Sequence, residues 1–263
     1  MPQRPTDRAF PRIRRVHATV LNISTYRFTP LQGLPALRER LYTRAQAAGL
    51  KGTVLLAEEG INLFVAGEPG PTRAWLAALG DETPALAGLR PKESFSAAQP
   101  FKRLKVKVKH EIIRMNAPQV RPQAGRAPSL PARTLARWIA QGHDDEGRPL
   151  RLLDTRNAFE VDVGAFEGAI DWRLSSFGDF PQALAQHADA LRGCAVVSYC
   201  TGGIRCEKAA LLMREHGLEH TWQLDGGILD YFLQTDGAAP GWQGRCFVFD
   251  EREALQANLT PEP

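Results

Sequence analysis

The chain has 263 residues, of which 43% are hydrophobic and 24% are charged, a composition that is typical of a globular protein and excludes a disordered one. The net charge of +4 is unevenly distributed. Residues 1–126 carry 21 basic and 9 acidic side chains, a net +12, whereas residues 127–263 carry 12 and 20, a net −8. This asymmetry indicates two domains, of which the basic one suits a polyanionic partner.

The cysteines and the terminus indicate a reducing compartment. Cys194, Cys200, Cys206 and Cys246 are too few for a disulfide framework, and neither they nor the histidines have the spacing of metal ligands. The N-terminal residues lack the apolar core of a signal peptide, and no run approaches about 18 apolar residues. We therefore expect a cytoplasmic protein with reduced thiols, no metal site and no membrane contact.

The first half of the chain has the pattern of an α+β sandwich. Alternating and helical periodicities predict, in order, a strand, a helix, two strands, a helix and a strand at residues 16–26, 35–48, 53–59, 61–67, 71–80 and 103–114. This β-α-β-β-α-β order predicts a ferredoxin-like domain over residues 1–115.

A proline-rich segment and a second domain follow. Residues 116–131 contain four prolines and predict an extended linker. Beyond it, apolar strands alternate with helices, which predicts an α/β domain with a parallel sheet over residues 132–236. The tail, residues 237–263, is weakly patterned.

The run VVSYCTGGIRCEKAALLMREHG (196–217) carries the strongest chemical signal. Cys200 ends an apolar strand, and a glycine-bearing loop connects it to a helix that begins near Cys206. Ligands bind at the carboxyl ends of strands in such sheets, and Gly202 and Gly203 allow backbone N–H groups to form an anion-binding nest. With Arg205 and the helix N-terminus nearby, we expect Cys200 to favour the reactive thiolate form.

Cys206 leaves two interpretations open. It lies six residues after Cys200 and is either a resolving thiol or a packed residue in the first turn of the helix. The alternative for the whole loop is a buried structural cysteine, but strand, cysteine, glycine loop and helix occur here in the order of a reactive site.

The loop and its surroundings resemble a rhodanese domain. The matching segments are LLDTRNAFEVDVGAFEGAIDW (152–172), CTGGIRCEKAA (200–210) and LDGGI (224–228). In addition, KGTVLLAEEGIN (51–62) and PFKRLKVKVKHEIIRM (100–115) resemble the N-terminal domain of the bacterial oxygen-dependent tRNA uridine(34) hydroxylases. The resemblance covers roughly residues 15–255. It implies a ferredoxin-like domain joined to a rhodanese domain, and conversion of the wobble uridine to 5-hydroxyuridine.

The resemblance also implies roles for individual residues. The reactive cysteine of the family falls on Cys200, in a loop that comprises Thr201, Gly202, Gly203, Ile204 and Cys206. Asp154, Arg156 and Glu160 would form a charged network that holds this loop. The alternative for these three residues is an ion-pair cluster on the surface. Leu63 and Phe64 depart from the small residues that are usual at their positions.

Basic residues are concentrated in one predicted strand. The chain has only seven lysines, yet Lys102, Lys105, Lys107 and Lys109 fall within eight residues, together with Arg103. On a strand, Lys105, Lys107 and Lys109 share one face. A solvated edge strand explains such a pattern, but with the resemblance we expect a stripe that binds tRNA phosphates.

The main functional hypothesis is hydroxylation of a tRNA uridine. No motif for a cofactor is evident, so O2 and an unidentified electron donor would be co-substrates. The Cys200 thiolate would add to C6 of a flipped-out uridine and give C5 carbanion character that reacts with O2. The nest and Arg205 would stabilise the developing oxyanion on the pyrimidine.

Two other functions compete with this hypothesis. Cys200 could carry a persulfide for sulfur transfer, although Thr201 stands where thiosulfate-using rhodaneses often have Arg. A non-catalytic RNA-binding module is the other alternative. A phosphatase is disfavoured because its loop requires Arg six residues after the cysteine, where this chain has Cys206. The oligomeric state is not indicated by the sequence.

Overall fold

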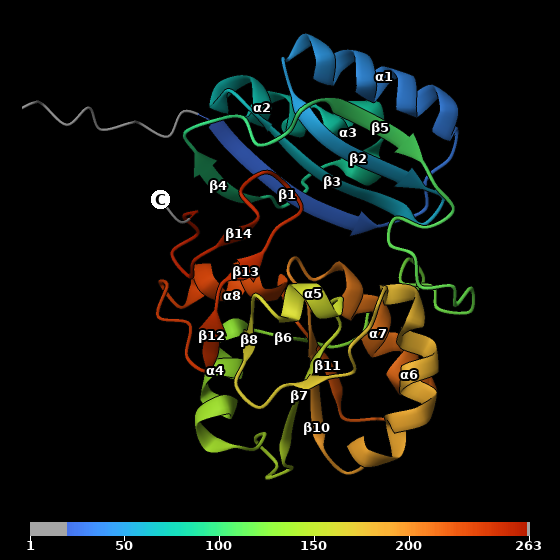
Figure 1. Cartoon of the computed structure of the whole chain (residues 1–263). Helices are drawn as coiled ribbons and strands as arrows, with labels where there is room; N and C mark the ends of the chain where they lie inside the picture. The colour runs from blue at the N-terminus through green and yellow to red at the C-terminus, as the bar shows by residue number, and fades with distance from the viewer. Residues whose placement is uncertain (1–19, 262–263) are drawn as a thin grey trace, which may run out of the picture.

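The computed structural model describes residues 20–261 as two stacked domains (Figure 1). The N-terminal domain comprises β1 (Val20–Phe28), α1 (Leu34–Ala47), β2 (Lys51–Ala57), β3 (Gly60–Gly67), α2 (Pro69–Ala77), α3 (Leu79–Glu82), β4 (Lys92–Ser96) and β5 (Leu104–Val108). Its strands lie in the order β4-β1-β3-β2-β5, with antiparallel neighbours except for the parallel pair β2 and β5. The predicted ferredoxin-like fold is confirmed, with β5 as an added edge strand.

The last strand of the predicted pattern was assigned wrongly. The ferredoxin-like position beside β1 is occupied by β4, whereas the predicted strand 103–114 is the shorter edge strand β5. The sequence of β4, KESFS, lacks an apolar alternation because Lys92 and Ser94 line a cavity rather than a core. Residues 16–19 of the first predicted strand lie outside the described residues.

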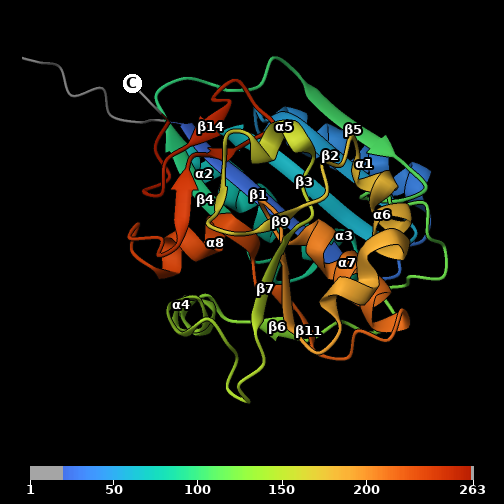
Figure 2. The same ribbon diagram turned by 60° about the horizontal axis from the view of Figure 1, so that its bottom comes forward.

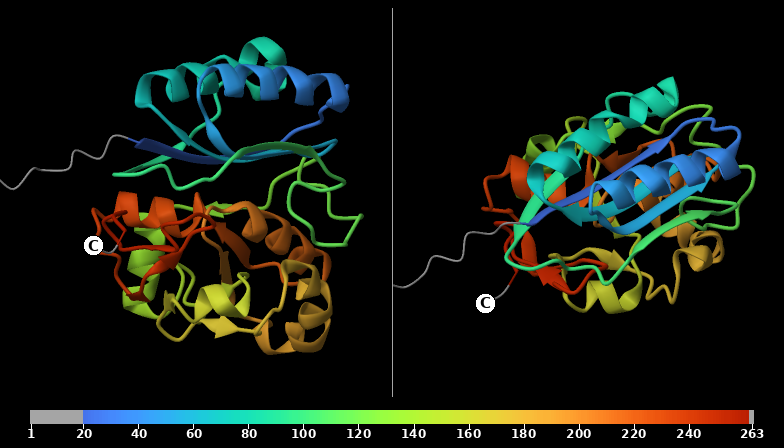
Figure 3. Two further views of the ribbon diagram at one scale, coloured as in Figure 1. Left: turned by 45° about the horizontal axis from the view of Figure 1, so that its top comes forward. Right: turned by 90° about the horizontal axis from the view of Figure 1, so that it is seen from above.

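The two faces of the N-terminal sheet have different partners. Leu21, Val54 and Leu56 pack with the helices in the domain core, and the alternate side chains of the same strands face the second domain. Figure 3 shows the helices on one side of this sheet and the second domain on the other. Alternation on these strands therefore separates core residues from interface residues.

A tight hairpin at Gly60 joins β2 to β3. Gly60 has a φ of +149°, and a Cβ there would lie 2.0 Å from the carbonyl oxygen of Arg27. Only glycine fits this close approach. The hairpin places Glu59, just before Gly60, against Lys208 of the second domain.

The C-terminal domain is a parallel sheet covered on both faces. It contains β6 (Ser129–Leu130), α4 (Ala132–Gln141), β7 (Leu150–Asp154), α5 (Ala158–Val161), β8 (Gly164–Phe166), β9 (Ile170–Asp171), α6 (Phe180–His187), β10 (Ala195–Tyr199), α7 (Ile204–Glu215), β11 (Thr221–Leu224) and α8 (Gly227–Gln234). Its strands lie in the order β6-β11-β10-β7-β9, all parallel (Figure 2). Core clusters with α6 and α7 on one face, and α4 and α8 on the other, confirm the predicted α/β architecture.

The linker and the tail are more closely packed than the sequence predicted. Ala117, Val120 and Ala127 are buried with α6 and α7, and residues 129–130 form β6 of the second sheet. The tail forms β12 (Trp242–Gly244), which pairs with β8, and the β13 (Cys246–Phe247) and β14 (Ala254–Leu255) hairpin. Within residues 20–261, no helix combines the length and apolar character needed to cross a membrane.

Candidate active site

Cys200 occupies the turn between β10 and α7. The chain leaves the strand at Tyr199 and enters the helix at Ile204, with Gly203 in the left-handed region at φ +99°. The Gly203 N–H donates to the Cys200 sulfur across 3.2 Å. The backbone N–H groups of Arg205 and Cys206 are also directed at this sulfur. The predicted nest is therefore built around the thiol itself.

The surroundings of Cys200 favour its thiolate. Complete burial raises the pKa of this thiol, but three other influences outweigh it: the neighbouring Cys206, the charge of Arg205, and backbone N–H donors. The pKa of Cys200 is therefore lowered below its ordinary value. A buried thiolate with this many donors has the electronic state of a nucleophile.

Cys206 lies against Cys200 rather than apart from it. It is fully buried, and its sulfur is 3.0 Å from the Gly203 carbonyl oxygen, to which the thiol donates. Burial and the neighbouring Cys200 raise the pKa of Cys206 well above its ordinary value. Cys206 therefore remains a neutral thiol beside the Cys200 thiolate.

The four charged residues predicted around the loop form two adjoining buried pairs. Arg156 binds Asp154 at 2.6 Å, and Arg205 binds Glu160 through both terminal nitrogens at 2.5 and 2.7 Å. A hydrogen bond of 3.3 Å from Arg156 to the Glu160 carbonyl oxygen joins the pairs. All four side chains are at most 6% exposed, so the surface-cluster alternative is wrong.

The position of Arg205 is set by its pairing with Glu160, which accepts a hydrogen bond from each of its terminal nitrogens. Arg205 lines the cavity, and its charge lowers the pKa of Cys200. Its predicted stabilisation of an oxyanion on the substrate stays a prediction.

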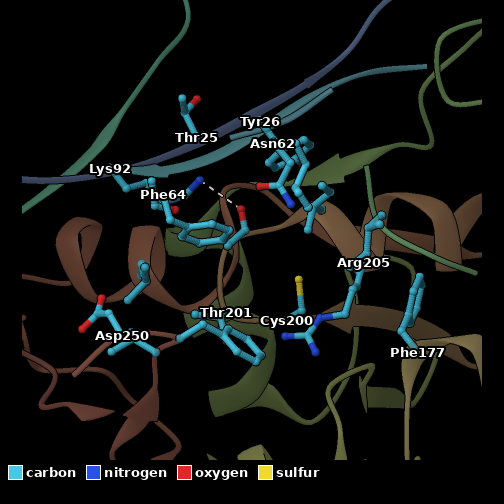
Figure 4. A pocket seen from close by; sticks show the side chains of 18 of the residues that line it. Thr25, Tyr26, Asn62, Phe64, Lys92, Phe177, Cys200, Thr201, Arg205 and Asp250 are labelled. Carbon is cyan, nitrogen blue, oxygen red and sulfur yellow. Dashed lines mark hydrogen bonds between the residues drawn. The ribbon is translucent and has the colours of Figure 1, made fainter. Parts of the chain in front are cut away.

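A cavity of about 620 Å³ lies between the domains and includes Cys200 in its wall (Figure 4). Such a volume is within the range of small-ligand sites. Its lining comes from the N-terminal sheet, the Cys200 loop, η2 (Phe177–Asp179) and the tail. The lining residues include Asn22, Ser24, Tyr26, Leu55, Asn62, Phe64, Lys92, Ser94, Phe177, Cys200, Thr201, Gly202, Ile204, Arg205 and Phe249.

Two side chains of the N-terminal domain hold the loop from the opposite wall. The Lys92 ammonium donates to the Gly202 carbonyl oxygen at 3.0 Å (Figure 4). The Tyr26 hydroxyl donates to Glu207 of α7 at 2.8 Å. Burial lowers the pKa of Lys92, opposed by the charges of Asp230 and Cys200. Lys92 therefore places a second cation beside the loop, in addition to Arg205.

A buried ion network joins the domains behind the cavity. Lys208 of α7 is 2% exposed and binds Glu59 at 2.8 Å and Glu111 at 2.7 Å. The Glu59 carboxylate also accepts the Ile112 N–H at 2.7 Å. These contacts fix the β2–β3 hairpin and the segment after β5 against the helix that begins at the Cys200 loop.

Sequence analysis missed Tyr26, Asn62, Phe64 and Lys92 as site residues. One signal was available: β1 reads VLNISTYRF, in which apolar Leu21 and Ile23 alternate with polar side chains. We predicted an ordinary strand there, although alternating polar residues on a sheet also occur where a second domain covers the polar face.

The predicted tRNA-binding residues lie outside the cavity but close to it. Lys102, Arg103, Lys107 and Lys109 are exposed, and Lys105 is half-buried. Because Lys107 pairs with Leu55 in register, both point to the cavity side of the sheet. Lys102 lies 3.6 Å from Glu251 of the tail.

Within residues 20–261, no group of three or more His, Cys, Asp and Glu side chains is arranged so that it could hold a metal ion.

Comparison with known families agrees with this architecture. Residues 20–112 match the UPF0176 acylphosphatase like domain, and residues 135–233 match the rhodanese-like domain. A rhodanese-like domain from Anabaena sp. has a similar solved structure at 20% identity and a TM-score of 0.36, covering 44% of this chain and 79% of its own. Fold and site thus define a protein that combines an acylphosphatase-like domain with a cysteine-bearing rhodanese-like domain.

Curated relatives cover nearly the whole chain. A tRNA uridine(34) hydroxylase of Bordetella petrii is 57% identical over 92% of this chain and 95% of its own length. A tRNA uridine(34) hydroxylase of Delftia acidovorans is also 57% identical, over 93% of this chain and 92% of its own. This chain belongs to the tRNA uridine(34) hydroxylase family.

Proposed function

We propose that this protein hydroxylates uridine 34 of tRNA at C5, with O2 as the oxidant and Cys200 as the nucleophile. Family membership supports the substrate. The observation that carries the chemistry is a buried thiol of lowered pKa in the wall of a cavity with room for a nucleotide. Enzymes that modify a base take it out of the stack into such a cavity.

The reaction requires a co-substrate that supplies two electrons, for which a thiol is a suitable chemical class. The Cys200 thiolate adds to C6, and the electron pair of the C5–C6 double bond moves to C5 and the C4 carbonyl. C5 bonds to O2, and one proton converts the resulting peroxide anion to a hydroperoxide. Two electrons and two protons cleave the O–O bond and release water. Loss of the C5 proton and departure of Cys200 restore the double bond and give 5-hydroxyuridine.

The cavity offers distinct contacts for each part of this reaction. The Gly203 N–H and the charge of Arg205 hold the attacking sulfur as a thiolate. The aromatic rings of Phe64, Phe177 and Phe249 suit stacking on a flat base. The Lys92 ammonium supplies positive charge for the pyrimidine oxygen that becomes negative in the adduct.

We further propose that the exposed lysines beside the cavity bind the tRNA backbone. Lys105 and Lys107 pair in register with Thr53 and Leu55 and therefore lie on the cavity side of β5. Phosphates that flank the flipped nucleotide would lie within reach of this edge. The positive charge of the first half of the chain is consistent with such a contact.

Isotope labelling tests the proposed activity. Purified protein would be incubated with unmodified tRNA, a thiol reductant and isotopically labelled O2, and the nucleosides would be analysed by mass spectrometry. We expect labelled 5-hydroxyuridine with the wild type and none with Cys200→Ala. Product from Cys200→Ala, or label that comes from water instead of O2, would overturn this mechanism.

The nest around Cys200 also suits a persulfide, which is the observation that favours sulfur transfer as a second candidate. The same protein would be incubated with sulfur donors, and the mass of the Cys200 peptide would be measured. A persulfide on Cys200 that passes to tRNA, without hydroxylation, would support this second function.

A further inference from the structure

Asn62 is a buried amide on the cavity side of the N-terminal sheet. It follows the Gly60 hairpin on β3, is 5% exposed, and lines the cavity. Its partners in register, Tyr26 on β1 and Leu55 on β2, line the same cavity. In Figure 4, Asn62 lies on the sheet side of the cavity and Cys200 on the loop side.

The orientation of this amide is fixed by its nitrogen. Asn62 Nδ2 donates to the Ile112 carbonyl oxygen at 3.2 Å. Ile112 is held in turn, because its N–H donates to the Glu59 carboxylate and Glu59 binds Lys208. Rotation of the amide by half a turn would bring two carbonyl oxygens together. Asn62 therefore presents its Oδ1, and not its Nδ2, to the cavity.

The Oδ1 atom of Asn62 is an acceptor without a donor. No hydrogen bond from any residue of the described chain reaches it. Once a ligand displaces water from the cavity, an acceptor in its wall that is left without a donor is unfavourable. Because Asn62 Oδ1 is fixed in direction and faces an open cavity, we expect a bound ligand to donate a hydrogen bond to it.

We infer that Asn62 Oδ1 accepts the N3–H of the target uracil and thereby selects uracil over cytosine. This inference rests on the proposed hydroxylation of a tRNA uridine. Uracil carries a hydrogen on N3, whereas cytosine has a lone pair there, which would face the lone pairs of Oδ1. N3 and C6 are opposite positions of the pyrimidine ring. One base between the two walls therefore presents N3 to Asn62 and C6 to Cys200.

Three anticodon stem-loops test this role, with uridine, cytidine or N3-methyluridine at position 34. The measured quantity is kcat/KM for hydroxylation with O2 and a thiol reductant. We expect the wild type to prefer uridine to both other substrates by at least about a hundredfold, because a site built around a hydrogen bond rejects bases that lack it. If the wild type reacts efficiently with N3-methyluridine, the inference is wrong, and this test needs no variant of the protein.

The variant Asn62→Ala is the complementary test. It should lower kcat/KM for uridine by about tenfold or more and leave the rate for cytidine nearly unchanged, so the preference for uridine decreases. Asn22→Ala is the matched control. Asn22 lines the same cavity and shares this pattern, since its Nδ2 donates to Ser94 and Ser96 and its Oδ1 has no partner among the described residues. It lies four residues along β1 from Tyr26, the register partner of Asn62, and is therefore too far away to contact the same edge of the base. This control should keep the preference for uridine.

The outcomes separate this inference from the activity on which it rests. An unchanged preference in Asn62→Ala, or an equal loss in Asn22→Ala, would contradict the role of Asn62 while the enzyme remains active. Absence of product from wild-type protein with the uridine substrate would instead reject the proposed function, and the inference with it.

Discussion

At the scale of single residues, the chemistry depends on how Cys200 keeps a negative charge away from water. Cys200 is buried in the cavity wall, so its charge is stabilised by protein groups: Arg205, the N–H groups of the loop and the neighbouring Cys206. Each of these groups was close to Cys200 in the sequence. Their geometry follows from the left-handed turn at Gly203.

The lowered pKa of Cys200 predicts an unusual pH dependence of alkylation. Because the thiolate persists below the pKa of a free thiol, its reaction with iodoacetamide should be nearly constant from about pH 7 to about pH 9, and should decrease only in more acidic solution. Cys206→Ala removes a neighbour that lowers the pKa of Cys200 and should shift this decrease to higher pH. The measurement is mass spectrometry of the Cys200 peptide. A tenfold increase in rate per pH unit across this range would contradict the expectation.

The buried Glu160–Arg205 pair predicts a large loss of stability when one charge is removed. Glu160→Gln leaves the Arg205 guanidinium without a counter-charge where neither side chain is more than 6% exposed. The free energy of unfolding should decrease by about 3 kcal/mol, measured by urea denaturation. Asp162→Asn is the control: it breaks the solvent-exposed pair with Arg173 and should leave the denaturation midpoint nearly unchanged.

At the scale of elements, the tight junction between the Cys200 loop and α8 can be tested at Gly227. This residue has a φ of +70°, and a Cβ would lie 2.4 Å from the Cys200 carbonyl oxygen. Gly227→Ala should therefore displace the loop, abolish hydroxylation and lower the free energy of unfolding by roughly 3–5 kcal/mol.

Gly217→Ala separates backbone strain from contact in this experiment. Gly217 has a similar φ of +78°, but the nearest atom to a Cβ there is the end of the Arg192 side chain, at 3.6 Å. This control should lower the stability by only about 1 kcal/mol and preserve the activity. Equal effects of the two substitutions on activity would show that loop displacement is not the cause.

Much of the architecture could be predicted because its periodicities are local. The β1–α1–β2–β3–α2 series, the parallel sheet and the Cys200 turn follow from apolar spacing and from glycine positions in sequence. β4 was missed because half of its side chains face a cavity, so its pattern is polar. Lys92 and Asn62 were missed as site residues for a related reason: they approach Cys200 only when the domains dock, and sequence spacing contains no information on docking.

At the scale of the whole molecule, the basic edge of the N-terminal sheet predicts salt-dependent tRNA binding. Replacing Lys105 and Lys107 with Gln should weaken binding and reduce the slope of log affinity against log salt by roughly one to two. Titrations at several salt concentrations measure this slope. Arg133→Gln, an exposed substitution on α4 of the other domain, should leave it unchanged. Loss of affinity without a change of slope would contradict phosphate contacts at these lysines.

Because the cavity is divided between two domains, exchanging one domain for another would remove part of the active site. The nucleophile and its nest belong to the second domain, whereas Tyr26, Asn62 and Lys92, on the opposite wall, belong to the first. A chimera that joins the second domain to an unrelated partner would retain the reactive cysteine but lose every contact that this wall makes with a base. A new scaffold would therefore acquire the activity only if the residues of both cavity walls were transferred together. Neither domain can be exchanged alone without loss of the activity.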